Sequence, residues 1–307
     1  MNQDRYRGAL LGLAVGDALG VPLEFKAPGS FSPVTGLIGG GQHNLKPGVW
    51  TDDTSMALCL AESLISCQGF DPTDQMERYV RWYKDGYLSS TGHSFDIGNT
   101  VRTALDTYSR TRQPYAGSDN PHTAGNGSIM RLAPIPLAFG TNPCLAITLA
   151  ADSSRTTHAA AEAVDGCRYL AALIIGALLG LDKTALLADA YTPLSDAWIH
   201  PLSGKIADIS SGSFKVKNPL EIRGTGYVAD SLEAALWAFY HSNTFAQGAL
   251  LAVNLGDDAD TGAVYGQVAG AYYGANAIPA EWLTTLYQRE YIEKVADQLL
   301  ELSHRIN

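Results

Sequence analysis

Residues 8–20 read Gly-Ala-Leu-Leu-Gly-Leu-Ala-Val-Gly-Asp-Ala-Leu-Gly, with a glycine at every fourth position. The same spacing returns near the end of the chain, at Gly262, Gly266, Gly270 and Gly274. Residues four apart share one ridge of a helix, and glycine is a poor helix former, so such a ridge costs stability unless another backbone packs closely against it. We therefore expect both helices to lie buried in the same core, which favours one domain over residues 1–307 rather than two.

Helical periodicity also marks much of the chain between these two segments. Apolar residues recur at helical spacing, whereas strand-like alternation bounded by turn residues is almost absent. The sequence therefore predicts an all-α fold with little sheet. Two long stretches, 25–49 and 191–227, read as loops, and loops of this length usually line or cover a site. The helices that we expect cover residues 5–19, 55–66, 73–84, 99–109, 143–151, 159–179, 230–240, 246–253 and 261–273.

The composition is that of a globular protein with a strong negative charge. Hydrophobic residues make up 46% of the chain and charged residues 17%, and the formal net charge is −10. An acidic surface repels phosphate backbones, which argues against general nucleic-acid binding. The amino terminus lacks the basic and apolar segments of a signal peptide, and the most apolar stretch, 169–181, is too short to span a bilayer. We expect a soluble, cytoplasmic protein without a membrane span.

The four cysteines, Cys59, Cys67, Cys144 and Cys167, show no CxxC spacing. A chain of this length does not need disulfides for stability, so we expect four reduced packing residues. A metal ion bound by this chain should therefore be a hard ion held by oxygen ligands.

Two segments place several carboxylates at the start of a helix. Thr51-Asp52-Asp53-Thr54 precedes one apolar helix, and Gly256-Asp257-Asp258-Ala259-Asp260-Thr261 precedes the last glycine-ridged one. Taken alone, each segment can be a helix cap, because threonine and aspartate cap helix starts well and acids favour the first turn. Three carboxylates within four residues repel one another, however, unless a cation neutralises them. Together the segments offer an oxygen-rich cage suited to Mg²⁺ or Mn²⁺, with charge enough for two ions.

At this point the chain resembles the ADP-ribosylglycohydrolase family over residues 8–274. The resemblance rests on the glycine-ridged segments, on both acidic segments, and on four further motifs: Phe95-Asp96-Ile97-Gly98-Asn99-Thr100, Asn126-Gly127-Ser128-Ile129-Met130-Arg131, Thr157-His158 and Gly226-Tyr227-Val228. It implies a single compact orthogonal helical domain with two Mg²⁺ or Mn²⁺ ions. It also implies hydrolysis of the N-glycosidic bond between ADP-ribose and a modified arginine of a protein.

The same resemblance assigns ligands and catalytic groups. Asp257 stands where some relatives carry glycine and is a lesser candidate, and Asp17 is expected to hydrogen-bond near the helix end rather than to ligate. Asp96 is expected near the distal ribose, where it could hold or protonate the guanidine leaving group. Glu24 is expected to guard the metal site, although read alone it is a solvated loop acid. The implied metal ligands are Thr51, Asp52, Asp53, Asp258, Asp260 and Thr261, and the catalytic candidates are Asp96, Asp53 and Glu24.

A third group of residues suits an ADP-ribose ligand. Residues 126–128 offer backbone N–H groups with little side-chain obstruction, which a pyrophosphate needs, although alone they read as an ordinary turn. His158 could donate to a phosphate or ribose oxygen, or be a structural hydrogen-bonding residue. Tyr227 could stack on adenine, or be an unremarkable loop aromatic. The substrate-binding candidates are Asn99, Asn126, Gly127, Ser128, Met130, His158 and Tyr227.

Three alternatives to an arginine-specific hydrolase remain open. The chain could cleave ADP-ribose from serine, from a nucleic-acid base or from a small molecule. It could be a module that binds ADP-ribose without cleaving it, although a binder could dispense with carboxylate repulsion. It could also have a structural, crystallin-like role. We expect an ADP-ribosylated protein as substrate, ADP-ribose as product, and a monomer.

Overall fold

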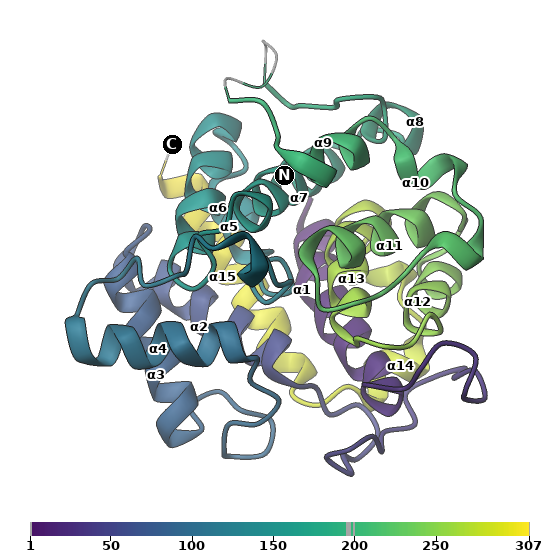
Figure 1. Ribbon diagram of the computed structural model, residues 1–307, viewed down its shortest axis with the longest axis horizontal. Helices are drawn as coiled ribbons and strands as arrows, with labels where there is room; N and C mark the ends of the chain where they lie inside the picture. Colours follow the sequence, from purple (N-terminus) through teal and green to yellow (C-terminus); the bar gives the residue numbers. More distant parts are fainter. Residues whose placement is uncertain (1, 195–197, 199, 307) are drawn as a thin grey trace.

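The structure is a computed structural model that describes residues 2–194, 198 and 200–306. Helices supply the regular structure of these residues, and β pairing among them is limited to isolated bridges, so the predicted all-α fold is confirmed (Figure 1). None of the described helices combines the length and the apolar character needed to cross a lipid bilayer. The α-helices are α1 (Gln3–Gly20), α2 (Asp52–Cys67), α3 (Pro72–Asp85), α4 (Asn99–Thr111), α5 (Pro134–Phe139), α6 (Pro143–Arg155), α7 (Ala161–Leu178), α8 (Lys183–Leu186), α9 (Gly204–Ser210), α10 (Ser213–Val216), α11 (Val228–Tyr240), α12 (Phe245–Val253), α13 (Asp260–Tyr273), α14 (Ala280–Thr285) and α15 (Arg289–Arg305).

Helices α1 and α13 lie side by side at the centre of the molecule (Figure 1). The prediction that both pack tightly into one core is confirmed, and the backbone that approaches each of them is that of the other. A Cβ atom on Gly266 would lie 1.9 Å from the carbonyl oxygen of Gly12, and one on Gly12 would lie 2.2 Å from that of Gly266. Only glycine allows two helix backbones to approach this closely. The two ends of the chain therefore meet in the buried core. The same reciprocal contact joins Gly8 with Gly270 and Gly16 with Gly262.

The expected helices are present, and two of their starts matter for the site. Helix α2 begins at Asp52 rather than at residue 55, and α13 begins at Asp260 rather than at residue 261. Both starts lie inside the acidic segments, because a carboxylate in the first turn interacts favourably with the unpaired N–H groups of a helix start. The acidic side chains are thereby fixed on rigid helix ends.

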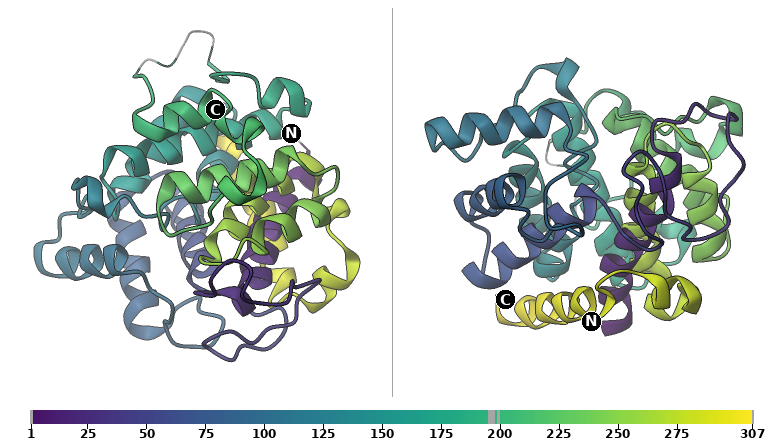
Figure 2. Two further views of the ribbon diagram at one scale, coloured as in Figure 1. Left: turned by 45° about the vertical axis from the view of Figure 1, so that its right-hand side comes forward. Right: turned by 90° about the horizontal axis from the view of Figure 1, so that it is seen from below.

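Helix α15 was not predicted, although its sequence carries the helical pattern. It crosses α1 (Figure 2), and Asp297 accepts hydrogen bonds from the Arg7 Nε and Nη2 atoms at 2.8 and 2.6 Å. The stretch 191–227, expected as a loop, contains the short helices α9 and α10, and its residues 195–197 and 199 lie outside the described residues. The buried apolar positions of α15 are Ile292, Val295, Ala296, Leu299 and Leu302.

The cysteines are free, as predicted, but only half of them are packing residues. Cys59 and Cys167 are buried, whereas Cys67 and Cys144 are exposed. The prediction of four packing cysteines is therefore wrong for the exposed pair, since each of these lies near a helix end that faces solvent.

Candidate active site

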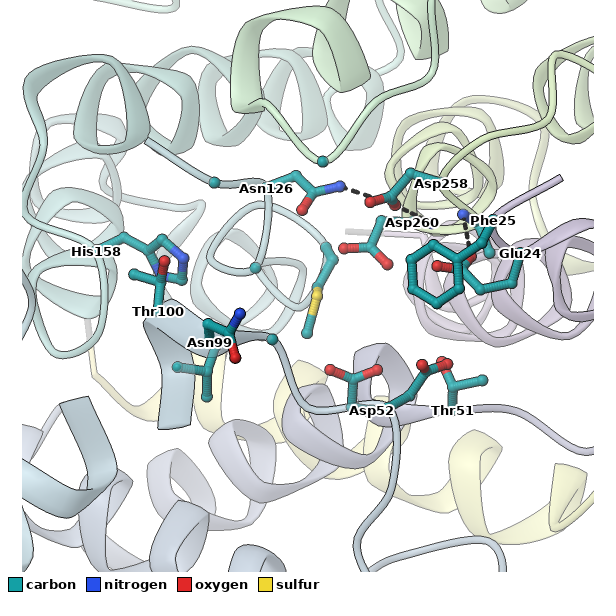
Figure 3. Close-up of a pocket in the computed structure, with 18 residues that line it drawn as sticks. Glu24, Phe25, Thr51, Asp52, Asn99, Thr100, Asn126, His158, Asp258 and Asp260 are labelled. Atoms are coloured by element: carbon teal, nitrogen blue, oxygen red, sulfur yellow. Dashed lines mark hydrogen bonds between the residues drawn. The ribbon is translucent and has the colours of Figure 1, made fainter. Parts of the chain in front are cut away.

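A cavity of about 240 Å³ lies where helices α2, α4 and α13 begin (Figure 3). Helix starts present unpaired N–H groups and a partial positive charge, which favours the carboxylates gathered there. The two acidic segments, some 200 residues apart in the sequence, face each other across this cavity. The sequence-predicted residues that line it are Glu24, Thr51, Asp52, Asp96, Asn99, Asn126, Gly127, Met130, His158, Asp258 and Asp260.

Asp17 is the link between the glycine-ridged helix α1 and the start of α2. Its Oδ1 atom accepts hydrogen bonds from the N and Oγ1 atoms of Thr51 at 2.9 and 3.0 Å, and its Oδ2 atom accepts from Thr54 Oγ1 at 2.6 Å and Thr54 N at 3.1 Å. Asp17 therefore caps α2 from outside, in place of the Thr51 side chain. This is the structural role that was predicted for Asp17.

Two predicted ligands, Asp53 and Thr261, are buried just behind the cavity wall. The Oδ1 atom of Asp53 and the Oγ1 atom of Thr261 have no hydrogen-bond partner among the described residues. The other carboxylate oxygen of Asp53 lies 3.1 Å from Thr51 Oγ1, whose single proton is shared between this oxygen and Asp17 Oδ1. A buried polar atom without a partner is costly, and a cation bound to these two oxygen atoms would offset that cost.

The second acidic segment is held in place by an amide and a helix start. Asp258 Oδ1 accepts hydrogen bonds from Asn126 Nδ2 and from the backbone N–H of Asp260, both at 3.0 Å. Across the cavity mouth, Glu24 Oε2 accepts from the backbone N–H of Ala259 at 2.5 Å. Burial, together with the nearby charge of Asp258, raises the pKa of Glu24 to about 9.

The buried carboxylates repel one another. Burial first, and repulsion from neighbouring carboxylates second, raises the pKa values of Asp52 and Asp260 well above the usual aspartate range, and the pKa of Asp53 is raised likewise. The donors are carboxylate and hydroxyl oxygens, the chemistry that Mg²⁺ and Mn²⁺ prefer. Within the described part of the chain, no three Asp, Glu, His or Cys side chains converge tightly enough to form a ready-made metal site. The residues fit a hard cation by chemistry, charge and unpaired oxygen atoms.

Asp96 reaches the cavity from a backbone conformation that is unusual for an aspartate, with φ +62°. Two side chains of the glycine-rich loop 25–49 hold its Oδ1 atom: Gln42 Nε2 at 3.0 Å and His43 Nε2 at 3.1 Å. The His43 ring also packs edge-on against Phe95, with ring centroids 4.9 Å apart. Sequence reasoning missed Gln42 and His43, because nothing in the sequence shows that these two loops meet.

A buried arginine, Arg131, organises the opposite end of the cavity. It donates to the carbonyl oxygen of Gly127 and, through Nη2, to Thr157 Oγ1 at 2.7 Å. Thr157 Oγ1 lies 2.8 Å from His158 Nδ1. Because Arg131 is always a donor, the assignment that satisfies every group has Thr157 donating to Nδ1 and leaves an Nε2–H donor on His158. Burial, with the charge of Arg131, lowers the pKa of His158 to about 3, so the ring is neutral.

Comparison with known proteins places this arrangement in a family. The family model described as ADP-ribosylglycohydrolase matches residues 1–306. The chain belongs to the ADP-ribosylglycohydrolase family. It is 42% identical over 301 residues to the "ADP-ribosylarginine hydrolase Tri1" of Serratia proteamaculans, a match that covers 98% of this chain and 80% of that protein. It is 33% identical to the "ADP-ribosyl-[dinitrogen reductase] glycohydrolase" of Rhodospirillum rubrum, over 98% and 97% of the two chains.

A solved structure agrees with this membership. A chain of an "ADP-ribosylglycohydrolase-related protein complex" superposes with a TM-score of 0.85 and 48% sequence identity, and the match covers 98% of both chains. The chain is thus an enzyme of the ADP-ribosylglycohydrolase class with the all-α fold.

Besides Asp53 and Thr261, three predicted residues of this ADP-ribosylglycohydrolase lie outside the cavity wall. Ser128 is buried and its hydroxyl accepts from Ser154 Oγ at 3.0 Å, so only its backbone can serve a ligand. Asp257, the lesser ligand candidate, has φ +71° and pairs through its backbone with the chain after Glu24. Tyr227 lies in a neighbouring cavity of about 570 Å³, which shares Thr100, Gly125 and Gly226 with the first cavity.

The neighbouring cavity has a fixed aromatic wall. The Tyr227 hydroxyl donates to Glu162, and Lys205 Nζ lies 4.8 Å from the centre of the Tyr227 ring. These contacts fix the ring orientation, so a planar group could stack against its open face.

Proposed function

We propose that this ADP-ribosylglycohydrolase releases ADP-ribose from a modified arginine side chain of a protein. The observation that carries the proposal is the placement of Asp96, whose Oδ1 atom is held by Gln42 and His43. The Asp96 side chain lines the cavity. Its other carboxylate oxygen, Oδ2, has no hydrogen-bond partner among the described residues. A fixed carboxylate with one free oxygen suits a guanidinium group. The arginine linkage named for the Tri1 relative supports the same choice.

Two divalent cations, Mg²⁺ or Mn²⁺, are part of this proposal. The residues that would hold them are Thr51, Asp52, Asp53, Asp258, Asp260 and Thr261. The unpaired oxygens of Asp53 and Thr261 and the raised pKa values of the carboxylates support this set, since a cation would relieve both costs. When bound, the ions supply the positive charge that orients ribose hydroxyl groups and activates water.

The rest of the cavity suits the ADP part of the substrate. The backbone N–H groups of Gly127 and Ser128 have no acceptor within the described part of the chain. The start of α4 lines the same cavity and lacks a side-chain cap, so its first N–H groups are also open to a pyrophosphate. The neutral His158 ring offers one further donor, and the Tyr227 cavity next to it would take the adenosine.

The reaction exchanges one bond for another. Water adds to C1″ of the distal ribose while the bond from C1″ to the guanidinium nitrogen breaks. The bonding electron pair stays on that nitrogen, and the proton that the water loses ends on the leaving guanidine, so arginine leaves as a guanidinium. Positive charge builds on the sugar as the bond lengthens, and the carboxylates around the cavity stabilise it. Asp96 holds the guanidine in place, and its carboxyl group could carry the proton to the leaving nitrogen.

The test is release of ADP-ribose from an arginine-ADP-ribosylated protein, measured with Mn²⁺, with Mg²⁺ and with a chelator. A serine-ADP-ribosylated protein is the matched control substrate. Release from arginine that requires metal supports the proposal. Release from serine alone would replace the linkage, and tight ADP-ribose binding without release from either substrate would favour a binding module.

A further inference from the structure

Phe25 stands at the mouth of the cavity in an exposed position. Its side chain is 65% exposed, and among the exposed large apolar side chains of the described residues it is the one that lines the site cavity. Figure 3 shows the ring on the side of Glu24, Thr51 and Asp52, with His158 at the far end. A phenyl ring left open to water gains little from the hydrophobic effect, so burial does not hold the ring at this place.

The backbone at Phe25 is also one that phenylalanine rarely adopts. Residues 23–26 form a type II turn: Glu24 has φ −52° and ψ 127°, Phe25 has φ +58°, and Lys26 N donates to Leu23 O at 2.9 Å. The third position of such a turn favours glycine or asparagine, because its φ is positive. Here the position carries a bulky side chain at a conformational cost. Strain of this kind persists where the surroundings enforce it, and it concentrates at functional sites.

The surroundings do enforce this turn. The backbone N–H of Phe25 donates to Asp257 O at 2.7 Å, and the N–H of Asp257 donates to Lys26 O at 2.8 Å. Glu24 is tied to Ala259 in the same stretch. The turn is therefore pinned by backbone and carboxylate contacts that do not involve the phenyl ring. The ring is free to serve a ligand.

The position of the ring indicates which part of a ligand it meets. The Tyr227 cavity opens from Thr100, Gly125 and Gly226, at the end of the site that carries His158, so a nucleoside there lies away from Phe25. The end near Phe25 carries the carboxylates of Glu24 and Asp52. Asp96 lines the same cavity and interacts electrostatically with both of them. An aromatic face among carboxylates favours a planar cation, and guanidinium is the cation that stacks best on such rings.

We propose that Phe25 is a specificity residue whose ring stacks on the guanidinium of the modified arginine while Asp96 accepts its N–H groups. This inference rests on the proposed function, because it presumes an arginine-linked substrate. The ring selects a cationic, planar leaving group over the neutral oxygen of a serine linkage. Free ADP-ribose, which has no guanidinium, gains nothing from the ring.

The test compares Phe25→Leu, Phe25→Tyr and Phe25→Gly with the wild type. For Phe25→Leu we expect kcat/KM on ADP-ribosylarginine to fall about 3- to 30-fold, chiefly through KM, because the substrate is already a cation before its bond breaks. Phe25→Tyr should stay within twofold of wild type, since it keeps the aromatic face. The affinity for free ADP-ribose, measured calorimetrically with Mn²⁺, should change less than twofold in both variants. Ile38→Ala, an exposed apolar residue of the same loop outside the cavity wall, is the matched control.

The outcomes separate this inference from the proposed function. An unchanged kcat/KM in Phe25→Leu would overturn the stacking role, and an equal loss of free ADP-ribose affinity would show that the ring supports the sugar instead. A wild type that does not cleave ADP-ribosylarginine would defeat the proposed function whatever the variants do. Phe25→Gly relieves the positive φ, so its thermal midpoint should not fall below that of the wild type. A clear fall would show that the ring serves packing and would overturn the inference.

Discussion

Replacing Gly266 by alanine puts a methyl group where no atom fits. The added Cβ would lie 1.9 Å from the carbonyl oxygen of Gly12 and 2.4 Å from its carbonyl carbon. Both are backbone atoms, so no side-chain rotation relieves the overlap. Because non-bonded contacts lie at about 3.5 Å, helices α1 and α13 would have to separate by roughly 1.5 Å.

The cost follows from that separation. Overpacking a well-packed core typically costs about 1–3 kcal/mol, and a clash between two backbones belongs at the upper end or beyond. Alanine returns at most about 1 kcal/mol through its better helix propensity. The net loss of unfolding free energy should therefore be at least about 2 kcal/mol. At an unfolding entropy of roughly 2.1 cal/mol/K per residue, a chain of 307 residues should lose at least about 3 °C in its melting temperature.

The assay is urea or thermal unfolding of Gly266→Ala beside Gly69→Ala. Gly69 follows α2, and a Cβ there would meet nothing nearer than 4.0 Å. The Gly69 variant should stay within about 0.5 kcal/mol of wild type, as surface substitutions usually do. The Gly266 variant should melt at least about 3 °C below the Gly69 variant. A difference of less than about 1 °C would show that α1 and α13 do not approach this closely.

Three further outcomes follow from the site. Asp17→Asn places an amide N–H₂ among the donors of Thr51 and Thr54, and should lower the unfolding free energy by about 2–4 kcal/mol in denaturant titrations. Asp260→Asn removes one repelling buried carboxylate, so it should melt higher than wild type without metal. Mn²⁺ at one hundred times Kd should stabilise wild type by about 2.7 kcal/mol and the variant much less, so that the order reverses. Below pH 6.5 the unfolded chain protonates His158 and the folded chain does not until about pH 3, so stability falls with pH. The stability advantage of wild type over His158→Asn should therefore shrink by about 2–3 kcal/mol between pH 7 and 4.5, and an advantage independent of pH would show that His158 is not held neutral.

Much of the fold could be predicted because the glycine repeats that permit its central helix contact are visible in the local sequence. A four-residue glycine spacing carries its own physical meaning, since only a neighbouring backbone compensates the lost side chains. The acidic segments were likewise visible, as closely spaced carboxylates need a reason to coexist. Helix α15 was missed even though residues 292–302 carry a helical apolar pattern.

The rest of the candidate site depends on contacts between distant loops. Gln42 meets Asp96 across 54 residues, and no local pattern encodes that pairing. Ser128 lies within a motif that suits a phosphate, yet its side chain turns into the core toward Ser154. No role was predicted for Arg131, because its importance comes from burial beside Thr157, which a sequence does not show.

The glycine ridges and the carboxylates belong to one construction. The tightest approach at the cavity end is between Gly16 and Gly262, where a Cβ on Gly16 would lie 2.0 Å from the carbonyl oxygen of Gly262. Gly16 precedes Asp17, which caps the start of α2, and Gly262 follows shortly after Asp260 at the start of α13. A side chain at either glycine would push apart the two helices whose ends bear on the acidic segments. The glycines lower the intrinsic stability of both helices, but they allow the close approach that fixes the spacing of the carboxylates. The stretch that sets the fold therefore also sets the dimensions of the site.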